Sequence, residues 1–352
     1  MSRLSGTVCA SLVRRQLKSH RRRESNLSQR VKAAIPWILS LAIVGYVLLS
    51  LDLEQLQSDI MMADMGRLVG IVATFTLIVF VVDTATLAVL FRRLITPVSY
   101  KEVLAVKGVS YFFNAINYSA GSGAIALFLK KKRGVPFLQG VSALLWLNFV
   151  DVLVLLAMLA VGVGLSGELL PSEQREGLPY VMAIGMAVAA GALIYWQIGF
   201  DFFFLGRLRN WRIFQAFREA RWSDYGHLML YRGLFIGLYV LMNWLTLPCF
   251  DLHISFVALL VYTPLLTFIQ IVPLSVSGLG AIQVAMAILY GHYLGGGPDI
   301  EARVYAFSFV IGPLTALIRI VLGYFFMTNV ARDFIPEAKE IAAAAHEEDS
   351  NR

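Results

Sequence analysis

The chain has 352 residues, of which 58% are hydrophobic and only 15% are charged, and its mean hydropathy is +0.69. Soluble domains contain about 45–50% apolar and about 25% charged residues, so this composition excludes a soluble globule, a disordered chain and a secreted disulfide scaffold. The net charge of +7 is spread between long apolar runs, where basic residues act as topology signals and headgroup contacts. We therefore expect a membrane protein with no nucleic-acid partner.

Long apolar runs mark the segments expected to cross the membrane, since a spanning helix needs about 20 such residues. In chain order these runs are 34–50, 68–91, 138–165, 180–200, 228–250 and 304–330. A basic stretch of more than about thirty residues precedes the first run, and no small-residue cleavage site follows it, so we interpret that run as a retained helix. The chain then divides into a basic arm (1–33), a transmembrane domain (34–330) and a short tail (331–352).

Two further apolar stretches, 103–129 and 254–294, are interrupted by glycine- and serine-rich breaks at 117–123 and 273–280. Non-helical backbone at membrane depth survives only where it is buried in protein or lines a wet cavity. Each stretch is therefore expected to form a re-entrant or broken helical hairpin. The alternative is two ordinary kinked spans per stretch, which would give more crossings.

The loop charges orient these segments under the positive-inside rule. The arm, the run 130–133 and the loop after residue 200 are basic and are expected in the cytoplasm, whereas the loop 52–64 is acidic and is expected outside. The predicted fold is thus an all-α polytopic membrane protein with about six full transmembrane helices and two oppositely oriented hairpins, about eight membrane segments in all. Both termini are cytoplasmic. Paired broken segments of opposite orientation are typical of inverted-repeat transporters, whose half-helix N-termini favour anions.

The second break carries a recognisable motif. Residues 271–283, IVPLSVSGLGAIQ, resemble the P-x-T-P-G-G-L-G-x-x-E signature of the lysylphosphatidylglycerol synthase transmembrane-region family. The first break, with Gly123 and the run KKKRGV at 130–135, looks like that family's P-G-x-x-G-E…R-x-x-G-V element, and Asp151 and Arg319 match an acid and an arginine of the family. The resemblance covers residues 68–330. It implies a flippase-like protein of the bacterial inner membrane that lacks the aminoacyl-transferase domain.

The sequence also departs from the family pattern. Ser119 and Ala124 replace the proline and glutamate of the first element, and Gln283 replaces the glutamate of the second. Both motif carboxylates are therefore absent. This difference argues against a cationic headgroup bound as in relatives that use those carboxylates, and it leaves open whether the substrate is changed or transport is lost.

Arg319 is the first candidate for contact with a substrate, because a guanidinium fork suits phosphate oxygens and a charge at membrane depth needs a partner or a cavity. The alternatives are a structural ion pair with Asp151 or Asp83, or an extended side chain that reaches the cytoplasmic surface. Asn148 and Asp151 share one helix face and either line the same cavity or hold the bundle together. Arg232, near the start of its span, is expected to reach the membrane surface or to serve the site.

The remaining candidates lie at the two breaks and are small or neutral. They either contact the ligand or satisfy backbone groups freed by the breaks; they are Asn117, Ser119, Gly121, Ser122, Gly123, Ser275, Ser277, Gly278, Gly280 and Gln283.

Residues 202–225 interleave aromatic side chains with arginines, which predicts an amphipathic helix on the cytoplasmic interface. This helix and the basic arm are expected to contact anionic phospholipids; a docking site for a partner protein is the alternative. The sequence does not indicate an oligomeric state.

The histidines are scattered and no nucleophile–base set or phosphate-binding loop is visible, so we expect no enzyme and no cofactor. The leading hypothesis is a transporter-like protein that translocates or binds a lipid with a phosphate-bearing headgroup. The alternatives are a small-solute or ion carrier with a closed wet cavity, and a non-transporting subunit of a lipid or envelope synthesis complex.

Overall fold

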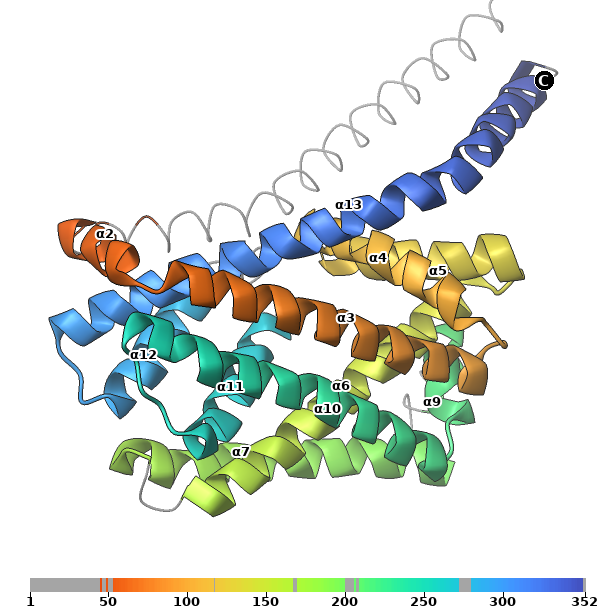
Figure 1. Ribbon diagram of the computed structural model, residues 1–352. Helices are drawn as coiled ribbons and strands as arrows, with labels where there is room; N and C mark the ends of the chain where they lie inside the picture. Colours follow the sequence, from red (N-terminus) through yellow and green to blue (C-terminus); the bar gives the residue numbers. More distant parts are fainter. Residues whose placement is uncertain are drawn as a thin grey trace, which may run out of the picture.

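The computed structural model describes residues 45, 49, 53–116, 118–166, 170–199, 206, 209–271 and 280–350. All regular structure in these ranges is helical (Figure 1). The elements, in chain order, are α2 (Leu53–Met62), α3 (Met65–Leu94), α4 (Tyr100–Ile116), α5 (Tyr118–Arg133), α6 (Phe137–Ser166), α7 (Ser172–Ile194), η2 (Tyr195–Gly199), η3 (Arg212–Phe214), α9 (Gln215–Glu219), α10 (Trp222–Thr246), η4 (Leu247–Phe250), α11 (Phe256–Ile271), α12 (Ala281–Tyr293) and α13 (Pro298–Ser350).

Five helical segments of the described chain are long and apolar enough to cross a membrane. They coincide with the last five runs predicted to span the membrane, and they are Met65–Leu94, Phe137–Ser166, Arg175–Ile198, Trp222–Phe250 and Pro298–Met327. The all-α polytopic fold is therefore confirmed. The first predicted span, 34–50, lies almost wholly outside the described residues.

The short helices form two antiparallel pairs that open toward opposite ends of the bundle (Figure 1). The pair α4–α5 opens at the end where α3 finishes, and Arg133 at the close of α5 pairs with Glu102 at the start of α4. The pair α11–α12 opens at the end that carries α2, where the rings of Tyr262 and Tyr293 lie 5.9 Å apart. The two helix pairs are therefore oriented oppositely to each other, as predicted for the two hairpins. The tip of the second pair, 272–279, lies outside the described residues.

The first break is narrower than the predicted range 117–123. Helix α4 runs to Ile116 and α5 begins at Tyr118, so Gly121 and Gly123 lie in helix rather than in non-helical backbone. Position 121 needs a glycine because α5 approaches α4 closely there. A Cβ atom at Gly121 would lie 1.9 Å from Asn114 Oδ1 and 2.8 Å from the Ser110 carbonyl oxygen. The residue therefore brings the first turn of α5 against α4.

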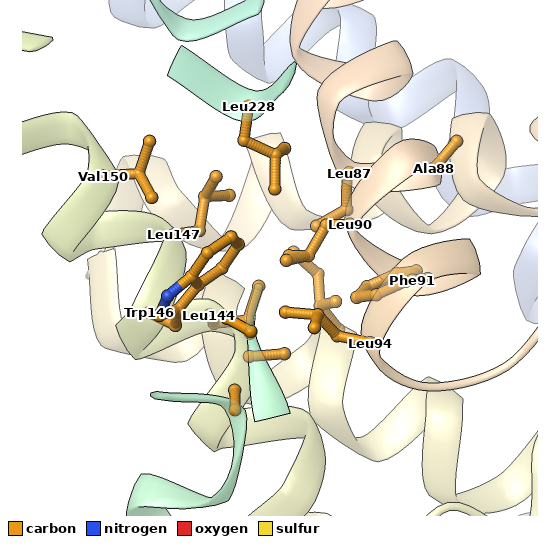
Figure 2. Close-up of a cluster of buried hydrophobic side chains, with 14 of the residues drawn as sticks. Leu87, Ala88, Leu90, Phe91, Leu94, Leu144, Trp146, Leu147, Val150 and Leu228 are labelled. Atoms are coloured by element: carbon orange, nitrogen blue, oxygen red, sulfur yellow. The ribbon is translucent and has the colours of Figure 1, made fainter. Parts of the chain in front are cut away.

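A buried aliphatic and aromatic cluster joins α3, α6 and α10 near the end of the bundle where α3 finishes. Figure 2 shows Leu87, Leu90 and Phe91 of α3 facing Leu147 of α6 and Leu228 of α10. Burial of each such side chain contributes about 1.5–3 kcal/mol in water, but lipid is itself apolar, so within the bilayer close packing holds these helices together.

The predicted interfacial helix over 202–225 is wrong as a single helix. In its described part the chain forms two short helices, η3 and α9, and becomes extended at Ala220 and Arg221 before α10 begins. Ala216 and Phe217 are buried, and the Ala216 N–H donates to Ser142 Oγ on α6 at 2.9 Å. The segment therefore docks into the bundle through Phe214 and Phe217, whereas Trp211 and Trp222 stay exposed.

The start of α4 is held by a reciprocal cap with pH-dependent strength. The Ser99 N–H and hydroxyl donate to Glu102 at 3.0 and 2.8 Å, the Glu102 N–H donates to Ser99 Oγ at 3.3 Å, and Arg133 donates to both Glu102 oxygens. The Ser99 N–H, followed by the Arg133 guanidinium, lowers the pKa of Glu102 from 4.5 to about 2.

Replacing Glu102 with glutamine is therefore expected to lower the melting temperature at pH 7. A carboxyl whose folded pKa is depressed stabilises the fold above its unfolded pKa and loses that effect as the pH falls through the folded pKa. The gap between wild type and Glu102→Gln should shrink from pH 4.5 toward pH 2, as measured by thermal unfolding in detergent. An equal gap at pH 7 and pH 2.5 would contradict this assignment.

Candidate functional site

Charged side chains from four helices meet in the interior of the bundle. Lys107 Nζ of α4 lies 2.7 Å from Asp83 Oδ2 of α3, and Arg232 Nη1 of α10 lies 3.1 Å from Asp83 Oδ1. Arg232 also donates two hydrogen bonds to Asp151 of α6. Its Nε donates to Oδ1, and its Nη2 donates to Oδ2 at 2.7 Å. We call Asp83, Lys107, Asp151 and Arg232 the central cluster.

Asp83, Asp151 and Arg232 lie within segments of spanning length, where unpaired charges are costly, and Lys107 lies in the shorter helix α4. Asp83, Asp151 and Arg232 are 6%, 9% and 8% exposed, so none of them reaches the surface of the bundle. Each carboxylate has cationic donors, which is how a protein tolerates charge in a low-dielectric interior. The prediction that Arg232 reaches the membrane surface is wrong, because two carboxylates hold it inside the bundle.

Arg319 of α13 extends this polar centre. Its Nη2 donates to the hydroxyl of Tyr239 on α10, and its guanidinium lies 5.6 Å from the ring centre of Tyr111 on α4. The Tyr111 hydroxyl in turn donates to Asp83 Oδ2 at 3.4 Å. Tyr111 therefore connects Arg319 to the central cluster.

Arg319 is not held by an acid. No salt bridge joins it to a carboxylate of the described side chains, and its buried Nε has no hydrogen-bond partner among them. The expected alternative of a structural ion pair with Asp151 or Asp83 is thus not what this structure shows. An arginine in this state has donors available for an anion.

Together the central cluster and Arg319 carry three cations and two carboxylates, which leaves one positive charge in excess among the described side chains. A monoanion such as a phosphodiester would neutralise the group. The Tyr239 hydroxyl on the Arg319 guanidinium and the Tyr111 hydroxyl on Asp83 add neutral polar contacts without adding charge. The arrangement suits binding of an anion, and no nucleophile–base pair accompanies it among the described residues.

The other predicted site residues fall in different places. Asn148 is half-buried on α6, one turn before Asp151, while Ser122 and Gly123 are half-buried and Gly121 is buried in α5. Gly280 has a φ of 87° and its N–H donates to Gln283 Oε1 at 2.7 Å, so Gln283 closes the first turn of α12. Asn117, Ser275, Ser277, Gly278 and the side chain of Ser119 lie outside the described residues.

Sequence reasoning missed Lys107, Tyr111 and Tyr239. Lys107 lies inside the apolar stretch 103–129, and an ionisable residue within a membrane segment is itself a signal of a functional or paired position. The two tyrosines carry no such signal, because tyrosine is common at membrane interfaces and in cores.

An apolar groove of about 480 Å³ lies between α6, α7, α11 and α12. Its lining consists of aliphatic and aromatic side chains with one glycine, including Leu156 and Leu159 of α6, Val181 of α7, Phe268 of α11 and Ile288 of α12. Leu156 follows Asp151 of the central cluster by five residues on α6. An apolar groove therefore shares a helix with the charged site.

These observations define a polytopic helical membrane protein with a charged centre buried inside its bundle. The sequence profile of the lysylphosphatidylglycerol synthase TM region family matches residues 37–323, and the chain belongs to that family. The match contains the central cluster and Arg319. No curated protein and no solved structure matches the chain.

Proposed function

We propose that this protein binds a lipid through a phosphate-bearing headgroup and moves it across the membrane. The observation that carries the proposal is the excess positive charge at Arg319, whose buried Nε has no partner among the described residues. The headgroup phosphate would take the donors of Arg319, since the guanidinium fork matches phosphate oxygens. The acyl tails would stay in apolar surroundings.

The apolar groove supports an amphiphile over a small solute. A solute carrier calls for a closed wet cavity, whereas the groove between α6, α7, α11 and α12 is lined almost entirely by hydrocarbon. The apolar groove can hold an acyl chain while the headgroup is bound at Arg319 beside the central cluster. The proposal assigns the chain no catalytic step. It keeps the predicted orientation in a bacterial inner membrane, with both termini cytoplasmic and the basic arm against anionic phospholipids.

Replacing Arg319 with alanine is expected to reduce lipid translocation in proteoliposomes by about 30- to 150-fold, since a lost charged hydrogen-bonding partner costs roughly 2–3 kcal/mol. Translocation of headgroup-labelled phosphatidylglycerol and phosphatidylcholine would be followed with a membrane-impermeant quencher. Arg319→Lys, which keeps the charge but loses the fork, should retain part of the activity. Arg212→Ala, which removes an exposed arginine of η3, is the matched control and should translocate as wild type does.

Two results would contradict the proposal. If folded wild-type protein translocates lipid no faster than protein-free vesicles do, the result would favour the solute carrier or the non-transporting subunit. Equal translocation by wild type and Arg319→Ala would remove Arg319 from the site.

A further inference from the structure

A second cavity, of about 470 Å³, lies at the end of the bundle that carries α2. Arg67 in the first turn of α3, Trp244 near the end of α10, His253 and Ser255 before α11, and Tyr293 at the end of α12 contribute to its lining. We call it the Arg67 cavity. It is distinct from the central cluster, because Asp83 follows Arg67 by sixteen residues on α3, or about 24 Å at 1.5 Å per residue.

The lining of the Arg67 cavity carries one arginine and no carboxylate, and the rest of it is largely apolar or aromatic. Asp64 is the nearest acid in sequence, but its side chain accepts the Arg67 backbone N–H at 3.0 Å and caps α3. Asp251 pairs with Arg303 at 3.1 Å and lies 3.9 Å from His253. No salt bridge to the Arg67 guanidinium occurs among the described side chains, so Arg67 lines the cavity without an ion-pair partner among them.

The backbone adds to the positive potential. Helix α11 begins at Phe256, directly after the cavity residue Ser255, and the Ser255 hydroxyl caps it by accepting the Ala258 N–H at 3.2 Å. The N-terminus of a helix carries a partial positive charge that favours anions. Arg67 and this helix end therefore act in the same direction.

The aromatic side chains show where this cavity lies relative to the bilayer. Trp244 is 42% exposed and packs edge-on against Phe256 at 6.0 Å, and Tyr293 packs against Tyr262. Tryptophan and tyrosine gather at the depth of the lipid headgroups. A cation beside a tryptophan at that depth is placed to meet a phosphate group.

We propose that the Arg67 cavity binds a phosphate group at the membrane surface on the α2 side, where headgroups of that leaflet present phosphodiesters. Arg67 supplies the charged donors, the α11 N-terminus adds its dipole, and Trp244 and Tyr293 flank the glycerol region of a lipid. This site does not depend on the translocation proposed above, because it is a surface binding site that a protein without transport activity could also possess.

The test uses the full chain in a maltoside detergent, titrated with short-chain phosphatidylglycerol in one arm and with inorganic phosphate in the other. The signal is the part of the tryptophan fluorescence change that is absent from Trp244→Phe. Saturable binding of the lipid in wild type, weakened at least about tenfold in Arg67→Gln, is the expected result. Arg175→Gln, which removes an exposed arginine from the same end outside the cavity, should bind as wild type does.

The two arms identify the source of the phosphate. Binding of inorganic phosphate with the same dependence on Arg67, and no binding of the lipid, would support the site with a solute as its ligand. No saturable Trp244 signal in either arm, or equal binding by wild type and Arg67→Gln, would overturn the proposal.

Two further variants distinguish loss of binding at the Arg67 cavity from misfolding and from loss of translocation. Arg67→Lys, whose melting temperature should match wild type because the side chain is exposed, should bind with intermediate strength. Arg319→Ala should keep the Trp244 signal and lose translocation, whereas a failure of the translocation proposal would leave the Arg67 dependence intact.

Discussion

Replacing Arg232 with leucine is expected to lower the free energy of unfolding by about 3–5 kcal/mol, the cost of removing one partner from a buried ion pair. Arg232 contacts Asp83 and Asp151 at once, so its loss leaves Asp151 without its cationic partner and Asp83 with Lys107 alone. The change should be measured by denaturant or thermal unfolding of purified protein in detergent.

The matched control is Arg93→Leu. Arg93 pairs with Asp224 at 2.7 Å, and its side chain is 33% exposed at the end of α3, while that of Asp224 is 10% exposed. An ion pair that one side chain shares with solvent contributes less than a fully buried pair, so this variant should lose less stability than Arg232→Leu. The double variant Arg232→Leu with Asp151→Leu should recover part of the loss, because it removes one of the stranded carboxylates. Equal effects of Arg232→Leu and Arg93→Leu would show that burial does not govern the pair.

Replacing Gly323 with alanine is expected to destabilise the protein by about 1–3 kcal/mol through overpacking at the crossing of α13 and α4. A Cβ atom at Gly323 would lie 2.7 Å from the Phe112 backbone nitrogen and 3.0 Å from the Gly108 carbonyl oxygen. These neighbours are backbone atoms, so the added methyl group can be accommodated only if the helices separate. Small residues at helix crossings are how membrane helices approach closely.

Gly312→Ala gives the matched control on the same helix, because a Cβ atom there meets nothing within 4 Å. Alanine favours a helix interior over glycine by about 0.5–1 kcal/mol. Gly312→Ala should therefore leave the melting temperature unchanged or raise it, while Gly323→Ala lowers it. Separation of α13 from α4 should also displace Arg319, so Gly323→Ala is expected to translocate less lipid. Equal melting temperatures for the two variants would contradict the tight crossing.

The sequence predicts the spanning helices well because their signal is simple. A run such as 138–165 has to be a membrane helix, and the structure places α6 at Phe137–Ser166. The site was predicted in part. Asp151 and Arg319 stand out as charges in apolar runs, but their partners depend on which helices are neighbours, and a single sequence does not encode that in any local pattern. For the same reason, Arg232 could not be assigned to two acids on α3 and α6 beforehand.

The prediction of a single helix over 202–225 is wrong for a related reason. Alternating aromatic and arginine residues over 202–225 fit a helix lying on a membrane, yet Phe217 is buried in protein and Ala220 is extended. Hydrophobic periodicity reports that a face will be buried, but it does not say whether lipid or protein covers it.

Helix α13 runs without interruption from Pro298 to Ser350 (Figure 1). One continuous helix, with Pro313 and Pro336 inside it, therefore carries Arg303, which is joined to Asp59 and Asp251, Arg319 at the polar centre, and the backbone that follows. A displacement of the distal half of this helix is therefore expected to move Arg319 as well, which couples the position of its guanidinium to the position of the tail.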